Sequence, residues 1–70
     1  MLYYVIRHGD LFYTEAGIFI SRLYEGLAVP SCSRLVYNEE GQAILNNWKS
    51  NNTIIQGLAM KNCYLEVLPK

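Results

Sequence analysis

One segment of this chain carries a sustained helical pattern, and it constrains the fold more than any other feature. Apolar or small residues follow the i, i+3, i+4, i+7 spacing of a single helix face. They are Gly41, Ile44, Leu45 and Trp48. Asn38 is the expected N-cap, because its side-chain oxygen can accept a hydrogen bond from a first-turn amide. Glu39 and Glu40 then lie where the helix dipole favours negative charge. Glycine at position 41 costs about 1 kcal/mol relative to alanine, unless close packing against a sheet requires it.

The first third of the chain is typical of short strands. Residues 2–8 are rich in aromatic and β-branched side chains, and Gly9-Asp10 is a hairpin turn signal. Residues 11–14 then form the returning strand. A second turn at residues 15–17 precedes a third strand at residues 18–23. Three adjacent strands joined by turns predict an antiparallel meander.

The rest of the chain adds shorter strands on either side of the helix. Residues 33–37 predict a short edge strand that leads into it. Residues 53–60 fit either a helical stripe or a strand, and the β-branched run with Gly57 favours the strand. A turn at Lys61-Asn62 then precedes a last strand at residues 63–68. The predicted fold class is α+β, an antiparallel sheet of about four to five strands with one helix packed on one face.

The balance of apolar and charged residues bears on the surface. The 70 residues predict a single domain, 1–70. Hydrophobic residues make up 51% of the chain and charged residues only 17%, against about 25% in typical domains. The formal net charge is zero, and no run of Lys and Arg marks a basic nucleic-acid binder. We therefore expect more apolar surface than one helix covers.

This surplus predicts an interaction surface. Tyr4 and Ile6 are expected to face the helix, so the alternate residues of the first strand face the other way. The run Ile18-Phe19-Ile20 cannot face one core, because strand side chains alternate. Tyrosine suits interfaces, although the six tyrosines could also complete a thin core and its rim. The predicted interaction residues are Tyr3, Val5, Arg7, Tyr13, Phe19, Tyr24 and Tyr37.

The sequence contains no recognisable set of catalytic residues. Arg7-His8-Gly9 resembles the signature of the histidine phosphatase and phosphoglycerate mutase superfamily, which implies His8 as nucleophile and Arg7 as phosphate ligand. That superfamily needs a second histidine, and His8 is the only one here. Ser31, Cys32 and Ser33 have no neighbouring base in the sequence. We predict no enzyme activity and no catalytic residues.

Cofactor, metal and membrane sites are not predicted either. The glycines are isolated and form no phosphate loop. Cys32, Cys63 and His8 make a poor zinc set, and the two cysteines are expected to be reduced thiols. The N-terminus lacks a signal-peptide pattern, and no apolar run approaches the length of a membrane span. A cytoplasmic protein is expected.

The order of these segments resembles small phage and prophage proteins. Those begin with a "YVI" strand, a glycine turn and an aromatic strand, continue through a capped helix and end on a short strand. The matching segments here are Tyr4-Val5-Ile6-Arg7, Gly9-Asp10, Phe12-Tyr13-Thr14, residues 39–45 and residues 66–69. The chain departs from that type between Leu23 and Ser33 and at Gly41.

The resemblance implies a phage-encoded protein, and several small phage proteins inhibit bacterial immunity, anti-CRISPR proteins among them. We therefore predict a non-enzymatic module that binds a host defence protein directly and forms a homodimer or larger assembly. The alternative is a small nucleic-acid or nucleotide-binding module that uses an aromatic sheet face.

Overall fold

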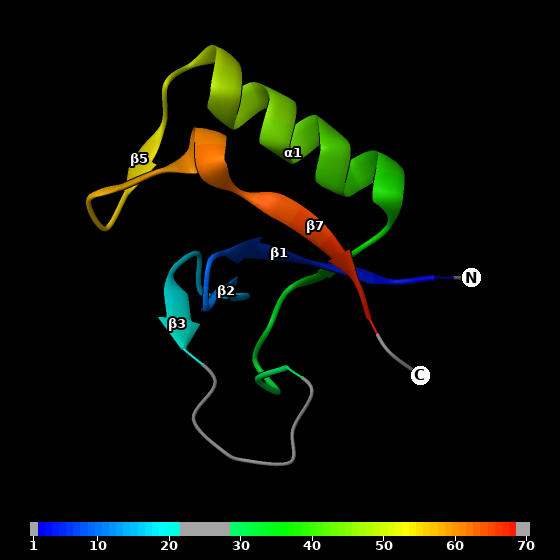
Figure 1. Cartoon of the computed structure of the whole chain (residues 1–70). Coiled ribbons are helices and arrows are strands. Elements are labelled where there is room, and N and C mark those ends of the chain that lie inside the picture. Colours follow the sequence, from blue (N-terminus) through cyan, green and yellow to red (C-terminus); the bar gives the residue numbers. More distant parts are fainter. Residues whose placement is uncertain (1, 22–28, 69–70) are drawn as a thin grey trace.

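The computed structural model describes residues 2–21 and 29–68. In chain order its elements are β1 (Tyr4–His8), β2 (Leu11–Tyr13), β3 (Phe19–Ser21), β4 (Leu35–Val36), α1 (Asn38–Ser50), β5 (Ile54–Ile55), β6 (Leu58–Ala59), the 3₁₀ helix η1 (Met60–Asn62) and β7 (Tyr64–Val67). Helix α1 lies along one face of an antiparallel five-stranded sheet (Figure 1). The predicted α+β fold is thus confirmed.

Strand β1 is the centre of this sheet. The order is β3-β2-β1-β4, and β7 pairs with the remaining edge of β1. Strand β2 takes the His8 end of the shared edge and β4 takes the Tyr4 end. The β1–β2 hairpin turns at Gly9, whose φ of +60° is a conformation that glycine adopts without strain. The predicted meander of β1, β2 and β3 is confirmed, although residues 22 and 23 of the expected third strand lie outside the described residues.

The ambiguous segment at residues 53–60 is a hairpin. Strands β5 and β6 pair through Ile54 with Ala59 and Ile55 with Leu58. The two turn residues, Gln56 and Gly57, have φ values of +54° and +77°, as a type I′ hairpin turn requires. The helical alternative for this segment is wrong. The expected turn at Lys61-Asn62 belongs instead to η1.

Helix α1 begins one residue differently from the prediction. Asn38 is the first helical residue, and Tyr37 is the N-cap without a side-chain capping hydrogen bond. The predicted Asn38 cap is therefore wrong. The predicted helix face is confirmed, because Ile44 and Leu45 pack on the core and Trp48 is part of it. The buried core residues on this side are Ile6, Phe19, Val36, Trp48 and Met60.

Gly41 lets the helix approach the sheet closely. A Cβ atom at this position would lie 2.7 Å from Leu65 Cδ2 and 3.0 Å from Val36 Cγ2. Both distances are shorter than ordinary carbon–carbon contacts. The loss of helix propensity at Gly41 is therefore offset by the packing of α1 onto β7 and β4.

The face of the sheet opposite α1 is covered at its centre. Val5 and Phe12 point away from the helix, yet their exposed fractions are 0% and 4%. Residues 29–34 run on this side of the sheet (Figure 1). They are joined to it by the N–H of Arg34, which donates to the C=O of Tyr13 at 3.0 Å. The expectation of an open second face is therefore wrong at its centre, because Val5 and Phe12 are buried there.

Candidate interaction surface

Two of the seven predicted interaction residues are core residues. Val5 is buried in the second face, as described above. Phe19 is 3% exposed and lies on the helix side, with its ring 6.3 Å from that of Trp48. In the run Ile18-Phe19-Ile20, Phe19 therefore points to the core, and Ile18 is exposed. The prediction that Val5 and Phe19 are available at the surface is wrong.

Tyr13 does not share a surface with Tyr3. Tyr13 is half-buried, and its ring meets that of Trp48 edge-on at 5.1 Å. It lies on the helix side of the sheet, whereas Tyr3 lies on the opposite side. The prediction that Tyr13 and Tyr3 belong to one interaction surface is therefore wrong. Tyr24 lies outside the described residues.

Arg7 is engaged by its own chain. Its Nη1 donates to both carboxylate oxygens of Glu66, at 3.1 and 3.0 Å. The guanidinium carbon also lies 4.5 Å from the centre of the Phe12 ring, a cation–π distance. Arg7 thus links β1 to β7 over a buried phenylalanine and has little charge to offer a ligand.

Tyr3 and Tyr37 are brought together at one end of the sheet. Their rings stack with centroids 5.0 Å apart and planes 19° apart, and the hydroxyl oxygens are 3.3 Å apart. Exposed fractions are 42% and 43%. The hydrogen bond with Tyr3 is the main cause that raises the pKa of Tyr37 above its usual value of 10.0. The Tyr37 phenol is therefore neutral at physiological pH.

Two leucines extend this pair into a surface. Leu35 is exposed and precedes Tyr37 by two residues, so both point to the same side of an extended segment. Leu2 is also exposed, and it lines a hollow together with Tyr37. We call Leu2, Tyr3, Leu35 and Tyr37 the tyrosine patch. Neither leucine was predicted from the sequence, although alternation within the predicted strand 33–37 places Leu35 on the same side as Tyr37.

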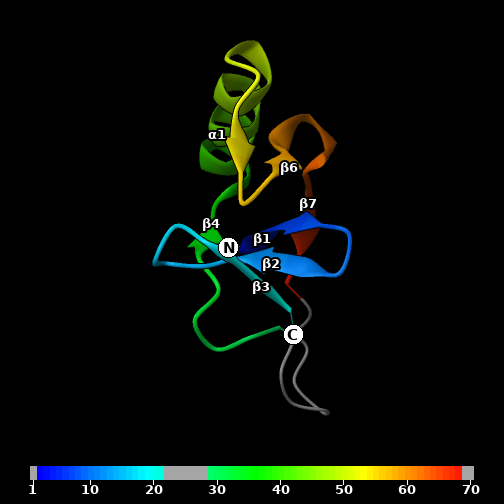
Figure 2. The same cartoon turned by 90° about the vertical axis from the view of Figure 1, so that its left-hand side faces the viewer.

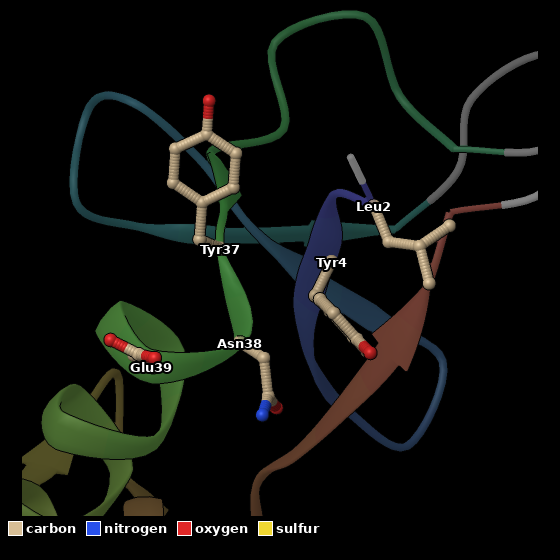
Figure 3. A pocket seen from close by; sticks show the side chains of 5 residues that line it. All are labelled: Leu2, Tyr4, Tyr37, Asn38 and Glu39. Carbon is tan, nitrogen blue, oxygen red and sulfur yellow. The ribbon is translucent and has the colours of Figure 1, made fainter.

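A hollow of about 440 Å³ adjoins the tyrosine patch. Figure 3 shows that the Tyr37 ring points away from Tyr4 and Asn38. The hollow thus lies where β1 begins and α1 starts, next to the stacked rings. It is lined by Leu2, Tyr4, Tyr37, Asn38 and Glu39. Such a shape can accept an apolar side chain of a partner while Glu39 supplies charge at the rim.

Reactive side chains are scattered over the described residues. The imidazole of His8 lies edge-on to Phe19 at 6.4 Å, and its Nε2 is buried without a hydrogen-bond partner in the described part of the chain. Burial raises the pKa of the Cys63 thiol to about 11, which disfavours the nucleophilic thiolate. Cys32 is exposed, and both cysteines are free.

Residues 2–21 and 29–68 offer no cluster of metal ligands and no helix that could span a membrane. No group of three or more histidine, cysteine, aspartate or glutamate side chains is placed to hold a metal ion there. None of the helices in this part of the chain has the length and apolar character that crossing a bilayer requires. The tyrosine patch, with its exposed aromatic and apolar side chains, is thus the candidate interaction surface among the described residues. Searches of known protein families, curated protein sequences and solved structures find no match to this chain.

Proposed function

We propose that this chain is a non-enzymatic protein-binding module that contacts its partner through the tyrosine patch. The observation that carries the proposal is the exposed, stacked pair of Tyr3 and Tyr37 beside two exposed leucines. Tyrosine is enriched among residues that dominate binding energy, since it offers a large rigid body and a polar tip. The stacking already orders both rings, so binding costs less side-chain entropy.

The charges around the patch fit this role. Arg34 Nη2 lies 3.1 Å from Glu40 Oε2, so these two charges balance each other next to Tyr37. Glu39 and the two phenol hydroxyls remain as polar groups at the edge of the patch. An apolar centre with a polar rim is the usual anatomy of a protein interface.

The identity of the partner is proposed from the resemblance to small phage proteins. On that basis the partner is a defence protein of a bacterial host, which the module inhibits by occupying one of its surfaces. The site of action is then the host cytoplasm. Among the described residues, the tyrosine patch involves no catalytic group, and inhibition by direct contact needs none.

The test is affinity capture from a bacterial host extract, followed by measurement of the dissociation constant for the retained protein. We expect Tyr37→Ala to weaken binding at least tenfold, because loss of a central tyrosine at an interface commonly costs about 2 kcal/mol. Tyr64→Ala is the matched control. Tyr64 is equally exposed but lies at the other end of β1, where its hydroxyl approaches the carbonyl of Gly9.

Two results would contradict the proposal. One is wild-type affinity in Tyr37→Ala, and the other is an equal loss in Tyr64→Ala. Tyr37→Phe separates the ring from the hydroxyl and should retain most of the affinity.

A second candidate function is favoured by the same stacked pair. Nucleic-acid bases stack on exposed aromatic rings, and Tyr3 with Tyr37 forms such a platform. This candidate predicts salt-dependent binding of a single-stranded oligonucleotide, weakened by Tyr3→Ala or Arg7→Ala. The ion pair between Arg7 and Glu66 counts against it, since the arginine is already neutralised. Fluorescence anisotropy with a labelled oligonucleotide at two salt concentrations tests this candidate. Absent or salt-independent binding would contradict it.

A further inference from the structure

The outer edge of β7 presents backbone groups that the described chain does not use. The N–H of Leu68 donates to the C=O of Tyr3 at 2.8 Å. Hydrogen-bonded and non-hydrogen-bonded residues alternate along an antiparallel ladder, so the backbone of Glu66 also turns towards β1. The N–H and C=O groups of Leu65 and Val67 therefore point outward. In the described residues β7 pairs with β1 alone.

We propose that a second copy of this chain binds this edge, with the two β7 strands antiparallel about a two-fold axis at Glu66. Leu65 of each copy then lies opposite Val67 of the other. Each such pair exchanges two backbone hydrogen bonds, so the symmetric contact makes four. The two sheets become one continuous sheet across the axis.

The register follows from the residues that flank β7. An axis at Leu65 would place Val67 opposite Cys63, whose N–H already donates to the C=O of Met60 at 3.0 Å. An axis at Val67 would place Leu65 opposite Pro69, which has no N–H. Only the axis at Glu66 satisfies all the outward groups of Leu65 and Val67. The edge is thus complementary to itself, and this favours a second copy as its occupant.

Side chains support the same arrangement. On the helix side, Val67 is 46% exposed and would be covered by Leu65 of the second copy. On the other side, Tyr64 would meet Leu68. The two Glu66 carboxylates face each other, and each is already held by the Arg7 of its own chain. The zero net charge of the chain adds no general repulsion between copies.

The first experiment measures the oligomeric state of the full chain by sedimentation over a range of concentrations, with Val67→Pro as the variant. Proline is tolerated on edge strands, and the Val67 N–H makes no bond to β1. The variant therefore removes two donors per dimer and leaves the fold intact. At about 1 kcal/mol for each lost bond, the dissociation constant should rise about thirtyfold.

Val67→Thr keeps the N–H and the branched side chain, so its dissociation constant should stay within a few-fold of wild type. A monomeric wild-type chain at all concentrations would overturn the proposal. So would a Val67→Pro variant that dimerises like wild type.

The second experiment tests the register and does not depend on the proline variant. In a Cys32→Ser, Cys63→Ala background, Glu66→Cys places two thiols at directly opposed positions, where Cβ atoms are about 4.5–5.5 Å apart. Oxidised glutathione should convert them to one disulfide and release two molecules of reduced glutathione. Tyr64→Cys is the control, since position 64 faces position 68 in this register. Equal or faster cross-linking at position 64 would overturn the axis at Glu66.

This inference is independent of the tyrosine patch, which contains neither Val67 nor Glu66. If Val67→Pro abolishes the dimer but the host partner is still captured, the two surfaces act separately. If the patch variants lose the partner and still dimerise, the proposed function and the dimer are again distinguished.

Discussion

Two edge strands of the sheet, β3 and β7, differ in whether the chain itself occupies their outward backbone groups. At the β3 edge, the side chain of Gln56 reaches Phe19 and occupies both of its outward backbone groups. At the β7 edge, no described residue occupies the groups of Leu65 and Val67. Open sheet edges invite pairing with other chains, and proteins usually block them. The β3 edge is therefore blocked at Phe19 by the chain itself, and the β7 edge is available to a second copy.

The closure at β3 depends on the turn between β5 and β6, which lie above the sheet at the end of α1 (Figure 2). The Oε1 of Gln56 accepts the N–H of Phe19, and its Nε2 donates to the C=O of the same residue at 3.1 Å. The side-chain amide thus replaces one residue of a neighbouring strand. Gln56 holds a φ of +54°, a conformation that costs an ordinary residue about 1 kcal/mol.

The largest expected effect comes from removing this closure. Gln56→Ala deletes both hydrogen bonds but still requires a positive φ at position 56. The free energy of unfolding should therefore fall by about 2 kcal/mol. Urea unfolding followed by tryptophan fluorescence measures it, since Trp48 lies in the core. Gln56→Glu retains an acceptor but lacks the donor and should lose roughly half as much.

Gln56→Ala should also leave the β3 edge as open to pairing with another chain as the β7 edge. With the cap gone, the β3 edge offers its backbone groups, and Gln56→Ala should associate beyond a dimer. Combined with Val67→Pro, it should still associate, now through β3. A doubly substituted chain that stays monomeric would show that Gln56 has no role in blocking the edge.

The second prediction concerns how β7 is held from the helix side. Gly41→Ala places a methyl group against Leu65 and Val36. Overpacking of this kind costs about 1–3 kcal/mol, while alanine regains about 1 kcal/mol of helix propensity. We expect a net loss of about 1.5 kcal/mol in urea unfolding. Leu65→Val should recover part of it, because it removes the two closest atoms. A more stable Gly41→Ala chain would contradict the close packing.

The third prediction concerns how β7 is held from the opposite side. Arg7 and Glu66 tie β1 to β7, with side chains 20% and 41% exposed. A double-mutant cycle with Arg7→Met and Glu66→Gln should give a coupling energy of about 1 kcal/mol, smaller at high salt. A cycle with Arg34 and Glu40, a more exposed pair, should give less. Equal coupling in the two cycles would mean that the partial burial of Arg7 adds nothing.

Local pattern was sufficient to predict several elements. The glycine turn after residue 8 and the helical spacing from Gly41 to Trp48 need only neighbouring residues, and both are confirmed. The α+β class follows from them. The hairpin at residues 53–60 was harder, because its apolar residues fit two periods and only the positive φ at Gln56 and Gly57 decides between them.

The candidate surface was harder to predict, for a reason visible at Val5 and Phe19. Alternation tells which residues share a face but not what covers that face. Residues 29–34 show no regular pattern, so nothing in the sequence indicated that they run on the side of the sheet where Val5 is buried. The pairing of Tyr3 with Tyr37 depends on β4 joining β1, a contact between residues far apart in the chain. The amide cap of Gln56 likewise has no local signal.

The prediction with the smallest expected effect on stability near neutral pH concerns the thiol of Cys63, the residue before β7. Burial raises the pKa of its thiol from 9.0 to about 11, whereas Cys32 is exposed. Alkylation by iodoacetamide at pH 8, followed by mass spectrometry, should modify Cys32 first. Cys63 should react about a hundredfold more slowly than a thiol with its usual pKa, because so little thiolate is present.

The raised pKa of Cys63 also determines whether the free energy of unfolding rises or falls with pH. The folded state binds the Cys63 proton more tightly than the unfolded state, so its contribution to stability is complete below pH 9 and declines as pH rises through 11. Cys63→Ala should weaken this alkaline decline in the free energy of unfolding, and Cys32→Ala should leave it unchanged. Equal alkylation rates for the two thiols would mean that the segment before β7 opens readily. The β7 edge would then lack the rigidity that pairing with a second copy requires.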